Sequence, residues 1–163
     1  MNADNPNYST AIDNNDLKSQ HHTVEGIDFS IVLSGESTNG EYTLLEAEFP
    51  ADSQSEIPSH IHRKEILIVY IIEGNFSFKY GKEVISGSSG MVFKFEKGIA
   101  HSYKKIGTKK GRLLLLYVPS GFENFFRELN QTHIDNLRKH GLEDPIMVQL
   151  LEKNYGVRML LYD

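Results

Sequence analysis

A His-x-His pair followed by a long β-branched run is the feature that most constrains how this chain folds. The stretch extends from Pro58 to Gly74, with His60 and His62 two residues apart. Residues two apart in a strand point to the same side of the sheet, so both imidazoles are expected to enter one space. The run from Ile66 to Ile72 is apolar on both alternating faces, which is typical of a strand that is covered on both sides.

The strand from Ile66 to Ile72 has consequences for assembly. One of its faces is expected to line the interior of a barrel. The other needs a cover, which a helix, the N-terminal arm or a second subunit can supply. The last possibility predicts a homodimer.

Further patterns place strands before and after this run, and helices at the end of the chain. Phe76 and Phe78 alternate with polar residues, as half-buried strands do, and Asn39-Gly40 is a turn signal. From Phe122 onward apolar residues recur at helical spacing, with a stop at Gly141 and a third helix expected from about Asp144 to Tyr155. We therefore predict a polar arm over residues 1–22, a β-barrel over residues 23–120 and a helical extension over residues 121–163.

Composition excludes several classes of function. The chain has 163 residues, no cysteine and a formal charge of −5 with histidine neutral. Disulfides, thiolate nucleophiles and sulfur-ligated metals are therefore excluded, and a net acidic chain lacks the basic balance typical of nucleic-acid binding. The first 20 residues contain no apolar segment of the signal-peptide kind, and no run approaches a membrane span. We expect a cytoplasmic protein with no membrane and no nucleic-acid partner.

A third histidine, His101, follows the glycine turn at Lys97-Gly98. Three imidazoles that meet inside a barrel would form a mononuclear metal site with His60, His62 and His101 as ligands. Imidazole nitrogen suits Fe, Ni, Mn, Cu and Zn, so the sequence predicts a divalent metal ion without choosing among these. His21 and His22 are poor co-ligands, because neighbours in a strand point to opposite faces.

These two histidine-bearing blocks resemble the motifs of the cupin superfamily. His60, His62 and Gly74 match the first motif, and Gly90, Gly98 and His101 match the second, with Glu96 where the family has proline. The resemblance covers roughly residues 24–118 and implies a double-stranded β-helix, or jelly roll, that is mainly β. The tail, with its segments 121–126 and 155–157, is also similar to that of single-domain bacterial cupins described as quercetin-dioxygenase-like.

The sequence departs from the cupin pattern at the family's carboxylate ligand, where it has Leu67. Leucine cannot ligate a metal. Glu65 shares the strand parity of position 67 but starts about 7 Å further back. The site is then either three histidines plus water, or three histidines plus a displaced Glu65 that acts as fourth ligand or catalytic base.

Two functions follow from this pattern. The first is a quercetinase-like dioxygenase that acts on a small oxygenated aromatic at the three-histidine metal. The second is a non-catalytic cupin that binds a small ligand, such as a sugar or an aromatic, beside a degenerate site. Aromatic residues are candidates for the substrate pocket, although small barrels also fill their interiors with such side chains: Tyr70, Phe76, Phe78, Phe93, Phe95 and Tyr103.

Overall fold

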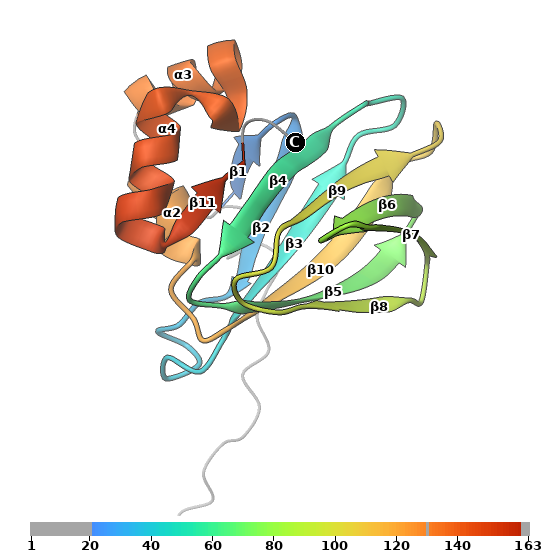
Figure 1. The fold of residues 1–163 in the computed structure, drawn as a ribbon, viewed down its shortest axis with the longest axis horizontal. Coiled ribbons are helices and arrows are strands. Elements are labelled where there is room, and N and C mark those ends of the chain that lie inside the picture. The colour runs from blue at the N-terminus through green and yellow to red at the C-terminus, as the bar shows by residue number, and fades with distance from the viewer. Residues whose placement is uncertain (1–20, 130, 161–163) are drawn as a thin grey trace, which may run out of the picture.

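Two antiparallel sheets face each other and form the body of the fold (Figure 1). The computed structural model describes residues 21–129 and 131–160. The six-stranded sheet has the order β1-β2-β3-β10-β5-β8, and the five-stranded sheet has the order β11-β4-β9-β6-β7. This mainly-β jelly roll with C-terminal helices confirms the fold class predicted from the sequence.

The strands have the following bounds in chain order: β1 (His21–Val24), β2 (Ile27–Leu33), β3 (Thr43–Phe49), β4 (Glu56–His62), β5 (Ile66–Glu73), β6 (Asn75–Tyr80), β7 (Glu83–Ser88), β8 (Val92–Phe95), β9 (His101–Ile106), β10 (Gly111–Val118) and β11 (Val157–Met159). The helices are α2 (Glu123–Glu128), α3 (Gln131–His140), a 3-10 turn η2 (Gly141–Glu143), α4 (Pro145–Leu150) and a π-helical turn η3 (Leu151–Tyr155).

The core lies between the two sheets and follows the alternation of the strands. Val69 and Ile71 on β5 and Leu113 and Leu115 on β10 are fully buried, as is Phe78 on β6 of the facing sheet. Each inward residue alternates with an outward one, because successive side chains of a strand point to opposite faces. The apolar run identified in the sequence is thus a central strand of the larger sheet.

The C-terminal extension gathers at one side of the barrel, beside β1, β4 and β11 (Figure 1). The Asp144 side chain caps α4 by accepting from the backbone N–H groups of Ile146 and Met147. Gly156 ends the helical part with φ 68°, a left-handed conformation that glycine adopts readily. The extension is not entirely helical, because β11 pairs with β4. A strand this short is not detectable as alternation in the sequence.

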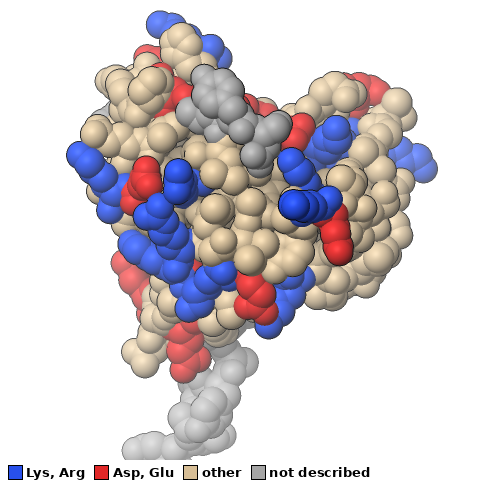
Figure 2. Space-filling model, viewed as in Figure 1, with Lys and Arg blue, Asp and Glu red and all other residues tan. Residues whose placement is uncertain are grey.

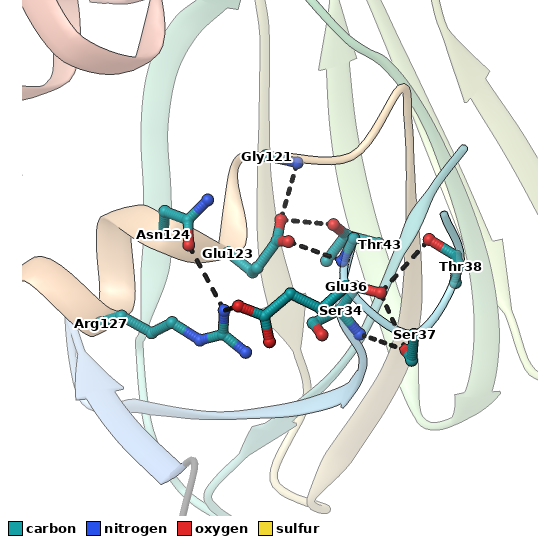
Figure 3. A network of polar contacts seen from close by, with 10 residues as sticks. Ser34, Glu36, Ser37, Thr38, Thr43, Gly121, Glu123, Asn124 and Arg127 are labelled. Carbon is teal, nitrogen blue, oxygen red and sulfur yellow. Dashed lines mark hydrogen bonds and ion pairs between the residues drawn. The ribbon is translucent and has the colours of Figure 1, made fainter. Parts of the chain in front are cut away.

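A buried carboxylate fastens the extension to the barrel (Figure 3). Glu123 at the start of α2 is 2% exposed and accepts hydrogen bonds from the Gly35 and Gly121 N–H groups, each at 2.7 Å. Its other donor is the Thr43 hydroxyl on β3. One side chain thereby ties α2 to the segment that joins β2 and β3, so the helices are held in a fixed place over the barrel.

The predicted arm falls almost entirely outside the described residues. Its last two residues, His21 and His22, begin β1 instead. None of the helices in the described ranges is long and apolar enough to cross a membrane. On the face seen in Figure 2, Lys and Arg side chains are interspersed with Asp and Glu side chains, so charges of both signs share that surface.

The outer face of β5 and β10 carries a row of apolar side chains. Tyr70 is 42% exposed and pairs across the strands with Leu114, while Ile68 pairs with Leu116. The described helices lie at another side of the barrel (Figure 1). A stable dimer buries about 800 Å² on each partner, usually with an apolar centre. The homodimer stays a prediction, and this row is where we expect its interface.

The dimer prediction is testable by sedimentation velocity. Wild-type protein is expected to sediment as a dimer, and Ile68→Glu is expected to shift it to monomer because a charge would be buried at the interface. Val84→Glu, on β7 at a residue that is 70% exposed, is the control and should leave the dimer intact. A wild-type monomer at high concentration would contradict the prediction.

Candidate metal centre

The three histidines come from neighbouring strands of the smaller sheet. His60 and His62 lie at the end of β4, and His101 is the first residue of β9, directly opposite His60 in the ladder. On its other side β4 pairs with β11, which places Met159 beside His60 and Val157 beside His62. The local sequence thus supplies two inward imidazoles by strand parity, and sheet pairing brings in the third.

The imidazoles are buried and close together. His60, His62 and His101 are 5%, 2% and 1% exposed. One ligand nitrogen from each lies within 4.8 Å of the corresponding nitrogens of the other two. The rings of His60 and His101 are the nearest pair, with centroids 4.4 Å apart. This arrangement is compatible with a metal ion held by three nitrogen ligands.

The hydrogen bonds of the rings leave the same nitrogen of each histidine available. His60 Nδ1 is 2.7 Å from the Pro58 carbonyl oxygen, and His101 Nδ1 is 3.1 Å from the Ile99 carbonyl oxygen. A carbonyl oxygen only accepts, so both Nδ1 atoms must carry the proton and both Nε2 atoms must present a lone pair. His101 Nε2 is buried and has no hydrogen-bond partner among the described residues. A buried nitrogen without a partner is costly, and a bound metal ion would satisfy it.

Burial also keeps the histidines neutral. It lowers the pKa of His60 well below the usual value and lowers the pKa of His101. Burial, together with repulsion from His101, lowers the pKa of His62 to about 3. Neutral imidazoles are the form that ligates metals, so the site needs no proton release from these rings at neutral pH.

Glu65 lies behind His62 rather than within the group of ligand atoms. Its Oε2 is 3.1 Å from His62 Nδ1, on the ring edge turned away from a bound metal when Nε2 ligates. Burial raises the pKa of Glu65 to about 7, although the nearby charges of Lys64 and Lys97 act in the opposite direction. A carboxylate on the Nδ1 edge fixes ring orientation and raises ligand basicity. We assign Glu65 this orienting position, and it is not part of the three-histidine cluster.

Leu67 occupies a core position on β5 and is 1% exposed. It pairs with Tyr117 on β10 and with Phe95 on β8. Where the cupin pattern has a carboxylate, this chain therefore has an apolar side chain packed between aromatic neighbours. In the described ranges, the group of candidate ligand atoms therefore consists of three imidazole nitrogens and includes no carboxylate.

The residues predicted for the substrate pocket have different locations. Tyr70 lies on the outer face of β5, because its parity is opposite to that of Val69 and Ile71, and it does not line the cavity beside the histidines. Phe76 and Phe78 are fully buried core, and Phe93 stacks on Phe78. Phe95 stacks on the His101 ring, with centroids 4.9 Å apart. Tyr103 alone of the six lines the cavity beside the histidines.

That cavity has a volume of about 40 Å³ and lies between the barrel and the extension. Sequence reasoning missed most of its wall, although the helical spacing of Phe122, Phe125 and Phe126 was visible. The sequence does not show that this apolar helix face turns toward His62. The lining of the cavity is almost entirely apolar or aromatic and consists of Val24, Phe29, Ile57, His60, His62, Tyr103, Tyr117, Phe122, Phe125, Phe126, Leu142, Leu151, Val157 and Met159.

Comparison with known proteins identifies the family of the barrel. Residues 46–117 match the model of the cupin domain, and this range contains all three histidines. The barrel is a cupin domain. The cupin superfamily predicted from the two motifs is thus confirmed, while comparison with the curated proteins finds no match.

Solved structures agree with this cupin assignment at the level of the fold. A predicted oxalate decarboxylase from Thermotoga maritima has 20% identity and a TM-score of 0.56, over 61% of this chain and 90% of that chain. KdgF from a Halomonas species has 20% identity and a TM-score of 0.55, over 62% and 86%. The Cnp3 cupin domain of Schizosaccharomyces pombe has 20% identity and a TM-score of 0.54, over 68% and 76%.

Proposed function

We propose that this cupin binds one divalent metal ion through the Nε2 atoms of His60, His62 and His101, and that it oxidises a small oxygenated aromatic with O₂. The observation that carries the proposal is the set of three buried imidazoles whose Nδ1 atoms are all hydrogen-bonded. The ion, when bound, would act as a Lewis acid and as a template for substrate and O₂.

The protein groups around the histidines support this proposal by holding the ligands in place. The Pro58 and Ile99 carbonyls fix two rings, and Glu65 fixes the third. Phe95 stacks on His101 with an interplanar angle of 14°, which prevents the ring from tilting. Leu67 leaves the centre without a carboxylate, so three neutral ligands would not offset the charge of a bound ion. This favours binding of an electron-rich oxygen of the substrate.

A second candidate function is favoured by the same leucine. A cupin that lacks the carboxylate ligand can retain its barrel as a binding site for a small sugar or aromatic without catalysis. The two functions predict different results for His60→Ala and His101→Ala. A non-catalytic protein is expected to keep its affinity for the ligand in both variants. An enzyme is expected to lose both metal binding and turnover.

Elemental analysis of protein purified without an affinity tag tests the proposal. After reconstitution with Fe²⁺, Ni²⁺, Mn²⁺, Cu²⁺ or Zn²⁺, we expect about one metal ion per chain for one of these ions. Glu65→Gln is expected to weaken that affinity about 10- to 100-fold, because the orienting carboxylate is lost. His140→Ala, an exposed histidine on α3, is the control and should bind like wild type.

Oxygen consumption with small catechols and flavonols then separates the two functions. Uptake that depends on the reconstituted ion and disappears in His60→Ala supports the dioxygenase. Less than about a tenth of an ion per chain for every metal would refute metal binding altogether. Full metal occupancy without oxygen uptake, combined with ligand binding, would favour the non-catalytic function.

A further inference from the structure

The cavity beside His60 and His62 has a wall that the cupin domain alone does not provide. Tyr103 and Tyr117 contribute from the barrel, but Phe122, Phe125 and Phe126 come from the extension. The match to the cupin family ends at residue 117, so these three phenylalanines lie beyond it. This part of the cavity wall therefore lies outside the region that matches the cupin domain.

We propose that this cavity binds a small uncharged molecule with an apolar body, and that the extension sets the size of molecule that enters. The inference rests on the proposed function in one respect, because His60 and His62 supply the polar end of the cavity. Among the residues that the structure describes, its lining contains no Asp, Glu, Lys or Arg. A charged ligand would lose its hydration there and gain no ion pair, so the cavity disfavours charged molecules.

The volume limits the ligand further. A water molecule occupies about 10–15 Å³ of such a cavity. The cavity has about 40 Å³ and therefore holds roughly three water-sized groups. An aromatic ring is larger and enters only when a side chain of the wall gives way. Molecules smaller than an aromatic ring thus fit wild type without any displacement. The aromatic of the proposed function enters by displacing a wall side chain, and it binds more tightly when a phenylalanine of the wall is shortened.

The wall from the extension is held at both ends, so its side chains determine the space. At one end, Glu123 is hydrogen-bonded to the Gly35 N–H and the Thr43 hydroxyl. At the other, β11 is paired with β4, and the Leu160 N–H donates to the Ser59 carbonyl at 2.8 Å. Phe125 packs between these attachments, with its ring centroid 5.8 Å from that of Phe122.

Binding to metal-free protein tests the charge selectivity. Propan-2-ol, acetate and isopropylammonium have the same number of non-hydrogen atoms but differ in charge. We expect propan-2-ol to shift the imidazole NMR resonances of His60 and His62 with an affinity at least about 10-fold higher than either ion, because desolvation penalises both charges. Equal or tighter binding of acetate or isopropylammonium at these resonances would overturn the inference.

Phe125→Leu tests the role of the extension. This variant is expected to bind benzyl alcohol at least about 10-fold more tightly than wild type, since shortening a buried side chain leaves space that the wall does not fill. Phe76→Leu, in the barrel core and not in the cavity wall, is the matched control and should bind benzyl alcohol no more tightly than wild type. If Phe125→Leu does not fold, Phe126→Leu on the same wall replaces it.

The outcomes separate this inference from the proposed function. Both experiments use metal-free protein, so a failure to bind metal leaves the neutral-ligand result standing. Conversely, a protein that binds the metal but whose metal-free form accepts no neutral probe, in wild type or in the phenylalanine variants, would overturn the inference alone.

Discussion

Replacing His101 with leucine is expected to abolish the stabilisation that a metal ion gives to this protein. A ligand at 1,000 times its dissociation constant stabilises the native state by about 4 kcal/mol, which corresponds to a rise in Tm of roughly 10 °C for a chain of this size. Wild type should show that rise with the ion that reconstitutes it. His101→Leu should show none, because two imidazoles and water hold an ion far less tightly than three.

The same substitution should leave the metal-free protein folded. The ring of His101 is buried and its Nε2 has no partner in the described part of the chain, so this nitrogen contributes a penalty rather than a bond. Leucine removes the penalty and keeps most of the packing against Phe95. Thermal unfolding followed by circular dichroism, with and without the ion, measures both effects. His140→Leu is the matched control and should retain the full metal-dependent rise.

A metal-dependent rise that persisted in His101→Leu would show that the ion binds elsewhere. The measurement therefore tests the location of the site as well as its existence. It is more decisive than activity, because it requires no knowledge of the substrate. The same data also give the Tm of metal-free His101→Leu, which would fall sharply if His101 were a structural residue of the barrel.

The sequence was sufficient for the parts of the site that depend on strand parity. His60 and His62 are two residues apart, and a strand sends both to one face, so their convergence follows from local geometry. The central strand from Ile66 onward was predictable because burial on both faces requires apolar residues at every position. Gly141 and Gly156 marked the ends of helical segments, as glycine does when φ must be positive.

What the sequence could not supply depends on tertiary contacts. Glu65 has the parity of an inward residue, but only the fold shows that its carboxylate meets the Nδ1 edge of His62. Tyr70 lies in a strand that is apolar on both faces, so the sequence pattern does not show which face is the interior of the barrel or on which side Tyr70 lies. The wall made by Phe122 and Phe125 depends on how the extension packs against the barrel. The pairing of β11 with β4 spans nearly a hundred residues of sequence, a distance at which no local pattern is informative.

Glu123→Ala is expected to be the most destabilising single change outside the barrel core, by about 3–5 kcal/mol. The substitution deletes the acceptor for the Gly35 and Gly121 N–H groups and for the Thr43 hydroxyl, all in a place where water does not replace it. Loss of these bonds frees the start of α2 from the barrel (Figure 3). The cavity wall is then expected to loosen as well, because Phe122 and Phe125 flank this residue.

Acid should produce a milder form of the same effect in wild type. Burial alone would raise the pKa of Glu123, but the hydrogen bonds from Thr43, Gly35 and Gly121 outweigh it and lower the pKa below its usual value. A carboxyl with a lowered folded-state pKa contributes stability above its unfolded-state pKa of about 4.3, and loses that contribution as the pH falls through the folded-state value. Below that pH, wild type and Glu123→Gln should therefore become more alike in stability.

Urea unfolding of wild type, Glu123→Ala, Glu123→Gln and Glu36→Ala, measured at neutral pH and near pH 3, tests this account. Glu36 belongs to the same network through its ion pair with Arg127 at 3.6 Å, but it is 83% exposed. Its substitution is expected to change the free energy of unfolding by less than about 0.5 kcal/mol, because exposed ion pairs contribute little. Equal losses in Glu36→Ala and Glu123→Ala would mean that the extension is held by its surface charges, and that the buried carboxylate is not the attachment that positions the cavity wall.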